Sequence, residues 1–156
     1  MVSIIVAMTE DRVIGNGGRI PWRITEDMAL FKMLTTNNIV IMGRTTWQSL
    51  PDRFRPLPDR VNIIVSGTLP DQQGATVCKD VGSALGEAKK HTGQVFCIGG
   101  AQLYKAMLPL ADVLHISWVK KKYEGDAYFP EVDFSMWDEI ESREFEEFTY
   151  KKYVRA

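Results

Sequence analysis

The sequence has little cysteine, and its cysteines do not form a metal site. Cys78 and Cys97 are the only two among 156 residues, and their separation is not a metal-ligand spacing. Cys97 lies inside the apolar run VFCI (95–98), so we expect it to be a buried free thiol, as is usual in a reducing compartment. The sequence therefore predicts a cytoplasmic protein without a metal centre.

Long hydrophobic runs and long basic runs are also absent. The N-terminal run VSIIVAM (2–8) has no basic segment before it and continues into polar residues, which is not the pattern of a signal peptide. No apolar run approaches membrane-spanning length. The net charge is −1, and KKK (120–122) is too short to indicate a nucleic-acid surface. We therefore expect no membrane or nucleic-acid partner, and from the size of the chain we expect a monomer.

What is present has the composition of one folded domain, with 45% apolar and 25% charged residues. Continuous apolar runs rich in β-branched residues predict strands at 2–8, 39–42, 61–65 and 95–98, with helices at about 25–35, 44–50, 80–90 and 101–108. This alternation predicts parallel strands joined by right-handed crossovers, with ligands at the carboxyl ends of the strands.

The C-terminal part has a different pattern. Strands are predicted at 113–121, 137–145 and 148–155, and only Glu146 and Glu147 separate the last two. So short a connection predicts a tight antiparallel hairpin. The predicted fold class is α/β: a single mixed, mainly parallel sheet with helices on both faces and a C-terminal antiparallel hairpin. One domain should cover residues 1–156.

Two glycine turns are candidates for phosphate binding. MGRTTW (42–47) and IGGAQLY (98–104) each place glycine between a strand and a helix, where free N–H groups can bind an anion. Each could be an ordinary turn, but two on one parallel sheet suggest two phosphate groups of one ligand. GNGG (15–18) is not the G-x-G-x-x-G fingerprint and indicates a mobile surface loop instead. A Walker A motif is absent, which disfavours phosphoryl transfer from ATP.

Asp27 is a carboxylate on an apolar helix face. Asp27, Phe31 and Leu34 follow at i, i+4 and i+7 and so share one face of the predicted helix. One explanation is local: Thr25 caps the helix, and acids are favoured in the first turn. That explanation does not account for an acid on the same face as Phe31, so a binding or catalytic role remains open.

Taken together, these segments resemble dihydrofolate reductase of the bacterial chromosomal type. The matching motifs are DRVIG (11–15), PW (21–22), DMALFK (27–32), VIMGRTTWQSL (40–50), RPLPDRVNIIVS (55–66), IGGAQLY (98–104) and EGDAYFP (124–130), in order over nearly the whole chain. The resemblance implies an eight-stranded sheet and an NADPH-dependent oxidoreductase, a target of antifolates, that supplies tetrahydrofolate to one-carbon metabolism. In this family a hydride reaches C6 of 7,8-dihydrofolate and a proton reaches N5.

The resemblance also implies roles for individual residues. Asp27 would bind the pterin 2-amino group and N3, Ser117 would bridge Asp27 and the pterin amine, and Trp22 would order a water molecule. Burial should raise the pKa of Asp27, while donors on the pterin favour its ionised form. Arg60 would bind the α-carboxylate of the glutamate tail. The substrate pocket implied in this way consists of Ile5, Asp27, Met28, Phe31, Leu50, Leu57, Arg60, Ile98 and Ser117.

NADPH is the implied cofactor. Its implied binding residues are Ala7, Ile14, Gly43, Arg44, Thr45, Thr46, Ser66, Lys79, Gly99, Gly100, Ala101, Gln102 and Tyr104. The family also implies a cis Gly99–Gly100 peptide. Residues 9–24 would form a loop that closes over the nicotinamide, and Asp126 would hold that loop.

Some positions depart from the family pattern. Ile20 replaces a common methionine, and Gly67 and Gln102 replace side chains that often bind the cofactor. His115 stands where tyrosine is frequent, and we interpret it as a structural histidine with satisfied hydrogen bonds.

Two alternative functions remain to be separated from dihydrofolate reduction. One is a reductase of the same fold that acts on a pyrimidine precursor in riboflavin synthesis. Asp27, Phe31 and Arg60 together argue against it. The other is a non-catalytic pterin-binding module, which the acid and both glycine turns disfavour.

Overall fold

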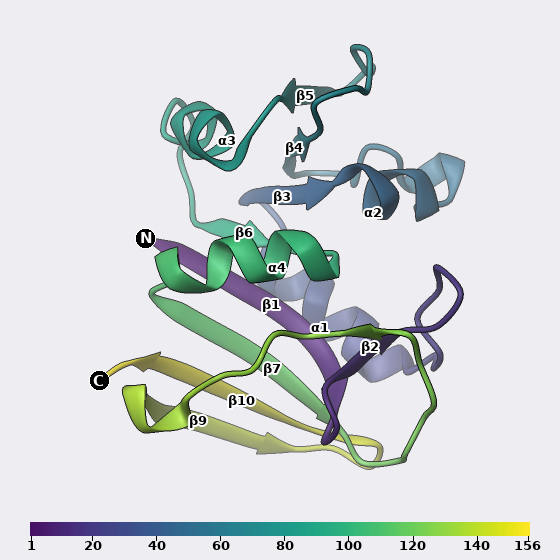
Figure 1. Cartoon of the computed structure of the whole chain (residues 1–156), viewed down its shortest axis with the longest axis vertical. Coiled ribbons are helices and arrows are strands. Elements are labelled where there is room, and N and C mark those ends of the chain that lie inside the picture. The colour runs from purple at the N-terminus through teal and green to yellow at the C-terminus, as the bar shows by residue number, and fades with distance from the viewer.

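One eight-stranded sheet organises the computed structural model, which describes all residues 1–156 (Figure 1). The strand order is β5-β4-β3-β6-β1-β7-β10-β9. The parallel strands are β1 (Val2–Thr9), β3 (Ile39–Gly43), β4 (Val61–Val65), β5 (Ala75–Cys78), β6 (Val95–Cys97) and β7 (Val113–Val119). At one edge, β10 (Phe148–Arg155) runs antiparallel to both β7 and β9 (Trp137–Glu144). The predicted mixed, mainly parallel sheet is confirmed.

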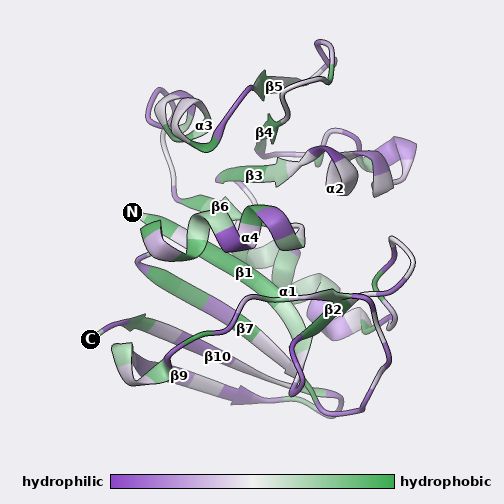
Figure 2. Ribbon diagram, in the orientation of Figure 1, coloured by the Kyte–Doolittle hydropathy of each residue, from purple (hydrophilic) through white to green (hydrophobic).

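Helices cover both faces of this sheet, as predicted. Side chains alternate along β1: Ile4 packs in one apolar cluster with residues of α3 (Val81–Ala88) and α4 (Ala101–Met107), whereas Ile5 packs in another with Trp47 of α2 (Arg44–Ser49). Helix α1 (Thr25–Thr35) lies on the Ile5 side, because its Phe31 packs against the same cluster. The apolar strands lie between these layers (Figure 2). Three short 3₁₀ turns complete the helical elements, at Asp52–Phe54, Leu108–Leu110 and Phe134–Met136.

The predicted cap of α1 is wrong. Ile24, not Thr25, occupies the N-cap position, and no side chain caps the helix. The Ile24 carbonyl accepts the first helical hydrogen bond, from the Met28 N–H at 3.0 Å. Ile24 is only 3% exposed and packs with Leu30, so burial of an apolar side chain fixes the start of this helix. The prediction that acids occupy the first turn is confirmed, with Glu26 and Asp27 there.

Three short strands were not predicted. β5 joins the main sheet beside β4, while β2 (Val13–Gly15) and β8 (Ala127–Tyr128) form a separate two-stranded sheet. Segments of two to four residues carry too few side chains for an alternation pattern to be recognised. The small sheet matters for function because it joins the loop after β1 to the segment before residue 130.

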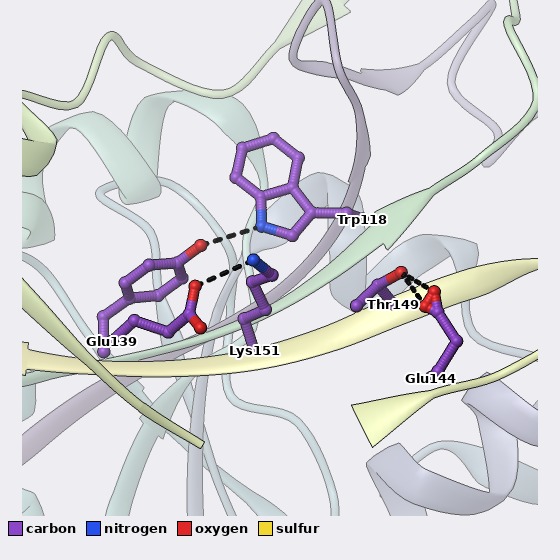
Figure 3. Close-up of polar contacts among 6 residues, drawn as sticks. Trp118, Glu139, Glu144, Thr149 and Lys151 are labelled. Atoms are coloured by element: carbon purple, nitrogen blue, oxygen red, sulfur yellow. Dashed lines mark hydrogen bonds and ion pairs between the residues drawn. The ribbon is translucent and has the colours of Figure 1, made fainter. Parts of the chain in front are cut away.

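The C-terminal hairpin is confirmed, and its exposed face carries polar pairs (Figure 3). Lys151 Nζ lies 2.8 Å from Glu139 Oε1, and the Thr149 hydroxyl donates to Glu144. Charged side chains along β9, the outermost strand, disfavour pairing with a further strand.

Both cysteines are free and buried, as predicted for Cys97. Burial raises the pKa of the Cys97 thiol to about 12, so this thiol is protonated at neutral pH and is not a nucleophile. No helix of the fold combines the length and the apolar character that a membrane span requires.

Candidate active site

A hydrogen-bonded carboxylate lies between helix α1 and strand β7. The Ser117 hydroxyl donates to Asp27 Oδ1 at 2.6 Å, across 90 residues of sequence. Ser117 is buried near the end of β7, and Asp27 is half-buried in the first turn of α1. The structure thus brings together the two residues whose contact the family resemblance implied.

Burial dominates the electrostatics of Asp27. Desolvation raises the pKa of this carboxyl above its ordinary value, and the hydrogen bond from Ser117 partly opposes that effect. Asp27 forms no salt bridge, and Ser117 is its one side-chain hydrogen-bond donor. Asp27 Oδ2 therefore keeps capacity to accept hydrogen bonds from a ligand that offers donors.

Helix α1 carries this site from its first turn to its last. Asp27, Phe31 and Thr35 lie at i, i+4 and i+8 on one face, about 12 Å apart from first to last at 1.5 Å rise per residue. At the far end, Arg60 Nη1 donates to the Thr35 hydroxyl at 3.1 Å, and Arg60 Nε donates to the Pro58 carbonyl at 2.8 Å. The carboxylate and the guanidinium thus mark the two ends of one elongated site.

The predicted apolar walls share one cluster between these ends. Ile5 and Leu57 belong to its buried part, and Phe31, Leu50 and Ile98 pack against it while remaining partly exposed. Met28 lies outside the cluster and is 54% exposed, on the turn that carries Asp27. This group of partly exposed apolar residues suits a flat aromatic ligand.

The two glycine turns meet at the carboxyl edge of the sheet. Gly43 ends β3 and Gly99 follows β6, the neighbouring strand, and the Gly43 N–H donates to the Gly99 carbonyl at 2.8 Å. Neither α2 nor α4, which start after these turns, has a side-chain cap. A Cβ on Gly100 would lie 3.7 Å from the Thr46 hydroxyl, so the turns approach each other closely. The Gly99–Gly100 peptide is cis, as the resemblance implied.

Most of the other predicted cofactor residues lie at this same edge. Arg44 and Thr45 open α2 and are exposed, while Ser66 and Lys79 directly follow β4 and β5. The Ser66 N–H donates to the Cys78 carbonyl, which holds those two strand ends together. The arrangement offers a guanidinium, an ammonium, hydroxyls and free N–H groups, which together fit a ligand with several phosphates.

Tyr104 packs against the Gly99 turn and joins it to β1. Its hydroxyl donates to the Ile5 carbonyl at 2.8 Å, and a Cβ on Gly99 would lie 2.9 Å from its ring. Gly99 also has a φ of 107°, so a larger residue there would be strained as well as crowded. The glycine at this position is therefore required by both the backbone and the neighbouring ring.

The loop after β1 is fastened to the segment around Asp126. The Gly17 N–H lies 3.2–3.3 Å from both Asp126 carboxylate oxygens, and the Asp126 N–H donates to the Gly15 carbonyl at 3.0 Å. Asn16 Nδ2 donates to the Glu124 carbonyl at 3.1 Å.

Three other predicted site residues lie on or beside this loop. Ala7 lies on β1 and Ile14 lies on β2. Trp22 is half-buried and packs against Tyr123, with ring centroids 5.3 Å apart.

His115 differs in part from its predicted state. It is buried two residues before Ser117, and its Nδ1 lies 2.7 Å from the Tyr150 hydroxyl. Its Nε2 is buried without a partner, so the prediction of fully satisfied hydrogen bonds is wrong. Two effects lower the pKa of His115 to about 4 and keep the ring neutral: desolvation, which is the larger, and repulsion from Lys152. The sequence alone does not predict the contact between His115 and Tyr150, because the two residues are 35 positions apart.

Sequence reasoning also missed residues that support the site. Thr35 could have been found, because it repeats the spacing of Asp27 and Phe31 on the same helix face. Arg12 could not: its Nη1 donates to the Phe129 carbonyl, a contact that only the fold creates.

Comparisons with known proteins agree with this geometry. The family model described as "Dihydrofolate reductase" matches residues 1–155. The dihydrofolate reductase of Bacillus subtilis is 40% identical over 146 residues, which cover 92% of this chain and 84% of that protein. The enzyme of the same name from Neisseria gonorrhoeae is 42% identical over 144 residues, 92% of this chain and 87% of its own length.

A solved structure extends the similarity to the whole fold. Dihydrofolate reductase from Enterococcus faecalis, complexed with NADP(H) and the compound RAB-propyl, superposes with a TM-score of 0.88 at 32% identity. The match covers 99% of this chain and 96% of that one. The family model matches this chain nearly from end to end, and the half-buried Asp27 and the two joined glycine turns agree with it, so the chain belongs to the dihydrofolate reductase family.

Proposed function

We propose that this chain reduces 7,8-dihydrofolate to 5,6,7,8-tetrahydrofolate with NADPH and thereby supplies one-carbon metabolism. The observation that carries the proposal is the Asp27 carboxylate, half-buried on an apolar face, desolvated and hydrogen-bonded only to Ser117. A buried carboxylate is costly unless something pairs with it. The 2-amino group and N3 of a pterin supply the missing donors.

We place the two ends of the substrate at the two ends of this site. Asp27 and Ser117 bind the pterin, and Ile5, Phe31, Leu50, Leu57 and Ile98 surround its rings and the benzoyl group. Arg60 binds the α-carboxylate of the glutamate tail. Its Nε and Nη1 are held by Pro58 and Thr35, which supports this role because the guanidinium is oriented before the ligand arrives.

The joined glycine turns fit the phosphates of NADPH. Gly43, Gly99 and Gly100 let the backbone approach closely, Arg44, Thr45 and Thr46 offer donors, and Ser66 and Lys79 extend the site along the sheet edge. Ala101, Gln102 and Tyr104 belong to the helix after the second turn, and Ala7 and Ile14 lie near the loop that closes the site. When bound, NADPH supplies the hydride that reaches C6.

The protein's own part in the chemistry is to bind, polarise and exclude water. The negative charge of Asp27 raises the basicity of the pterin, and the proton for N5 arrives through a water molecule ordered near Trp22. The loop held by Asp126 shields the site, and exclusion of solvent strengthens the electrostatic effect of Asp27.

The setting of the enzyme is part of the same proposal. Residues 1–156 form one dihydrofolate reductase domain, which the eight-stranded sheet and the apolar clusters on its faces support. We propose that this domain acts as a monomer. The two free buried thiols suit the reducing cytoplasm. Antifolates that mimic the pterin should bind at Asp27, and we expect no nucleic-acid or membrane partner.

One assay tests this function. NADPH absorbance at its reduced-nicotinamide band should fall when dihydrofolate is added, and a diaminopyrimidine antifolate should abolish the fall. NADPH oxidation with a riboflavin-pathway pyrimidine but not with dihydrofolate would favour the alternative reductase. Ligand binding without any oxidation would favour a binding module.

A further inference from the structure

Arg55 lies in the segment between α2 and β4, and its side chain turns back onto the end of α2. Its Nη2 donates to the carbonyl oxygens of Gln48 and Leu50, at 2.9 and 2.7 Å. The last carbonyls of a helix have no partners within it, and a cation near them is favoured by the helix dipole. Arg55 therefore acts as the C-terminal cap of a helix of only six residues.

The other two guanidinium nitrogens have different surroundings, because Asp52, the partner of Nη1, is fully exposed. Arg55 Nη1 lies 3.8 Å from Asp52 Oδ1, and Nε is buried without a partner. Arg53, two residues earlier, provides a contrast: it is exposed, and its guanidinium lies 4.8 Å from the ring centroid of Phe54. Two arginines of one loop thus have the same charge and different surroundings.

The carbonyls that Arg55 holds connect both halves of the proposed site. α2 begins at the residues proposed to bind NADPH, and Leu50, directly after its end, belongs to the substrate wall. Further along, Leu57 is fixed by the Asn62 side chain, through hydrogen bonds of 2.9 and 3.0 Å to its N–H and carbonyl. Asn62 therefore anchors one end of the loop to β4, and Arg55 anchors the other end to α2.

We propose that Arg55 is a positioning residue of the substrate pocket. By capping α2 it fixes Leu50 relative to Leu57, and it joins this apolar wall to the helix that opens with Arg44. The inference rests on the proposed function, since it assigns Arg55 a part in binding the ring system of dihydrofolate. Arg60 touches the glutamate tail, whereas Arg55 acts through the walls.

Binding measurements on two ligands test the difference. Fluorescence titration gives the Kd of dihydrofolate, which has a glutamate tail, and of a diaminopyrimidine antifolate, which has none. Arg55→Ala should weaken both by a similar factor, roughly tenfold, because both contact the walls. Arg60→Leu should weaken dihydrofolate alone. Arg53→Ala, which removes the same charge from the same loop, should leave both Kd values within about twofold.

Steady-state kinetics give a second measurement. Arg55→Ala should raise the KM for dihydrofolate while kcat stays within about twofold, because the groups around the reacting atoms are unchanged. If Arg55→Ala weakens only the tailed ligand, Arg55 binds the tail directly and the proposal is overturned. If neither Kd changes in a folded Arg55→Ala, the proposal is likewise overturned.

A conservative variant covers the case in which Arg55→Ala does not fold. Arg55→Lys keeps the charge but replaces the planar fork with a single ammonium, so its two Kd values should both lie above those of the wild type. A folded Arg55→Lys that loses affinity for dihydrofolate alone would contradict the proposal. Failure of the proposed function gives a different result, since the wild type would then not oxidise NADPH with dihydrofolate at all.

Discussion

The α1 face of the sheet and the exposed face of the C-terminal hairpin differ in how their polar side chains are hydrogen-bonded. On the hairpin, Lys151 pairs with Glu139 and Thr149 with Glu144, in partly or fully exposed positions (Figure 3). On the α1 face, Asp27 has one hydrogen-bond donor among its neighbours. The polar side chains of the hairpin pair with one another, whereas Asp27 on the α1 face keeps one carboxylate oxygen free to accept hydrogen bonds.

This difference shows how the fold separates stability from binding. A polar pair in water stabilises a fold only slightly, because solvent can replace either partner. A desolvated carboxylate destabilises the free protein, and a ligand that supplies donors regains that energy on binding. The same residue types therefore serve solubility at one place and recognition at the other.

The largest expected effect comes from removing the charge on the α1 face. Asp27→Asn should fold and should lose roughly a thousandfold in kcat/KM at pH 7, about 4 kcal/mol, because the amide cannot raise the basicity of the pterin. Activity should partly return as the pH falls, since substrate already protonated at N5 enters the site. A pH–rate profile near that of the wild type would remove Asp27 from the mechanism.

The same substitution should also affect stability, with the opposite sign. Because the folded pKa of Asp27 is raised, the folded state holds its proton at pH values where the unfolded chain has lost it. Stability from this group therefore falls as the pH rises through that window. At pH 7 and without ligand, the denaturant concentration at which half of Asp27→Asn is unfolded should equal or exceed that of the wild type.

The next largest effect should come from His115, whose pKa in the folded protein is about 4 against an ordinary value of 6.5. The unfolded chain binds more protons than the folded one between these values, so stability is complete above about pH 6.5 and declines toward pH 4. The shift corresponds to about 3 kcal/mol. Denaturant unfolding at pH 7 and pH 4.5 should show a smaller acid loss for His115→Gln than for the wild type.

His91 is the matched control for that measurement, because it is the other histidine of the chain and lies on the surface, 3.4 Å from Glu87. His91→Gln gives the reference with which the acid-induced loss of stability of His115→Gln is compared. If His115→Gln loses as much unfolding free energy between pH 7 and pH 4.5 as the wild type does, other groups cause that loss.

A smaller effect is expected from the cofactor end. Arg44 is the cation placed at the start of α2, while Gly67 and Gln102 offer no charge, so discrimination of NADPH from NADH should depend mainly on Arg44. Arg44→Ala should bring the two dissociation constants close together, a change of about 1.5–3 kcal/mol, or roughly ten- to a hundredfold. Added salt should narrow the wild-type gap, and Arg53→Ala should leave it unchanged. A mutant that still prefers NADPH as strongly would place the 2′-phosphate elsewhere.

The smallest effect should come from the hairpin. Lys151→Ala removes the ion pair with Glu139, and unfolding free energy should fall by only about 0.2–1 kcal/mol, less at high salt. The kcat and KM for dihydrofolate should not change, because both residues lie away from α1. A large loss of activity would contradict the division between the two regions.

Much of the fold could be predicted because its signals are local and long enough to recur. The apolar runs at 39–42 and 61–65 and the helical segment 25–35 appear within about one residue of their expected bounds. Phe145 and Phe148, which flank the two glutamates of the hairpin, stack with ring centroids 4.4 Å apart. The strands β2, β5 and β8 were missed because their pairing partners, rather than their own patterns, make them strands.

The sequence by itself determined that both glycine turns would lie at the carboxyl edge of the sheet, because each follows a strand that the pattern predicts to be parallel. It also placed Asp27 on an apolar helix face. Only the tertiary structure decided that Ser117 would bond Asp27, that Thr35 would hold Arg60, and that His115 would keep one nitrogen unpaired. Hydrogen bonds and desolvation depend on atoms a few ångströms apart in space, and these partners lie 25 to 90 residues apart in the chain.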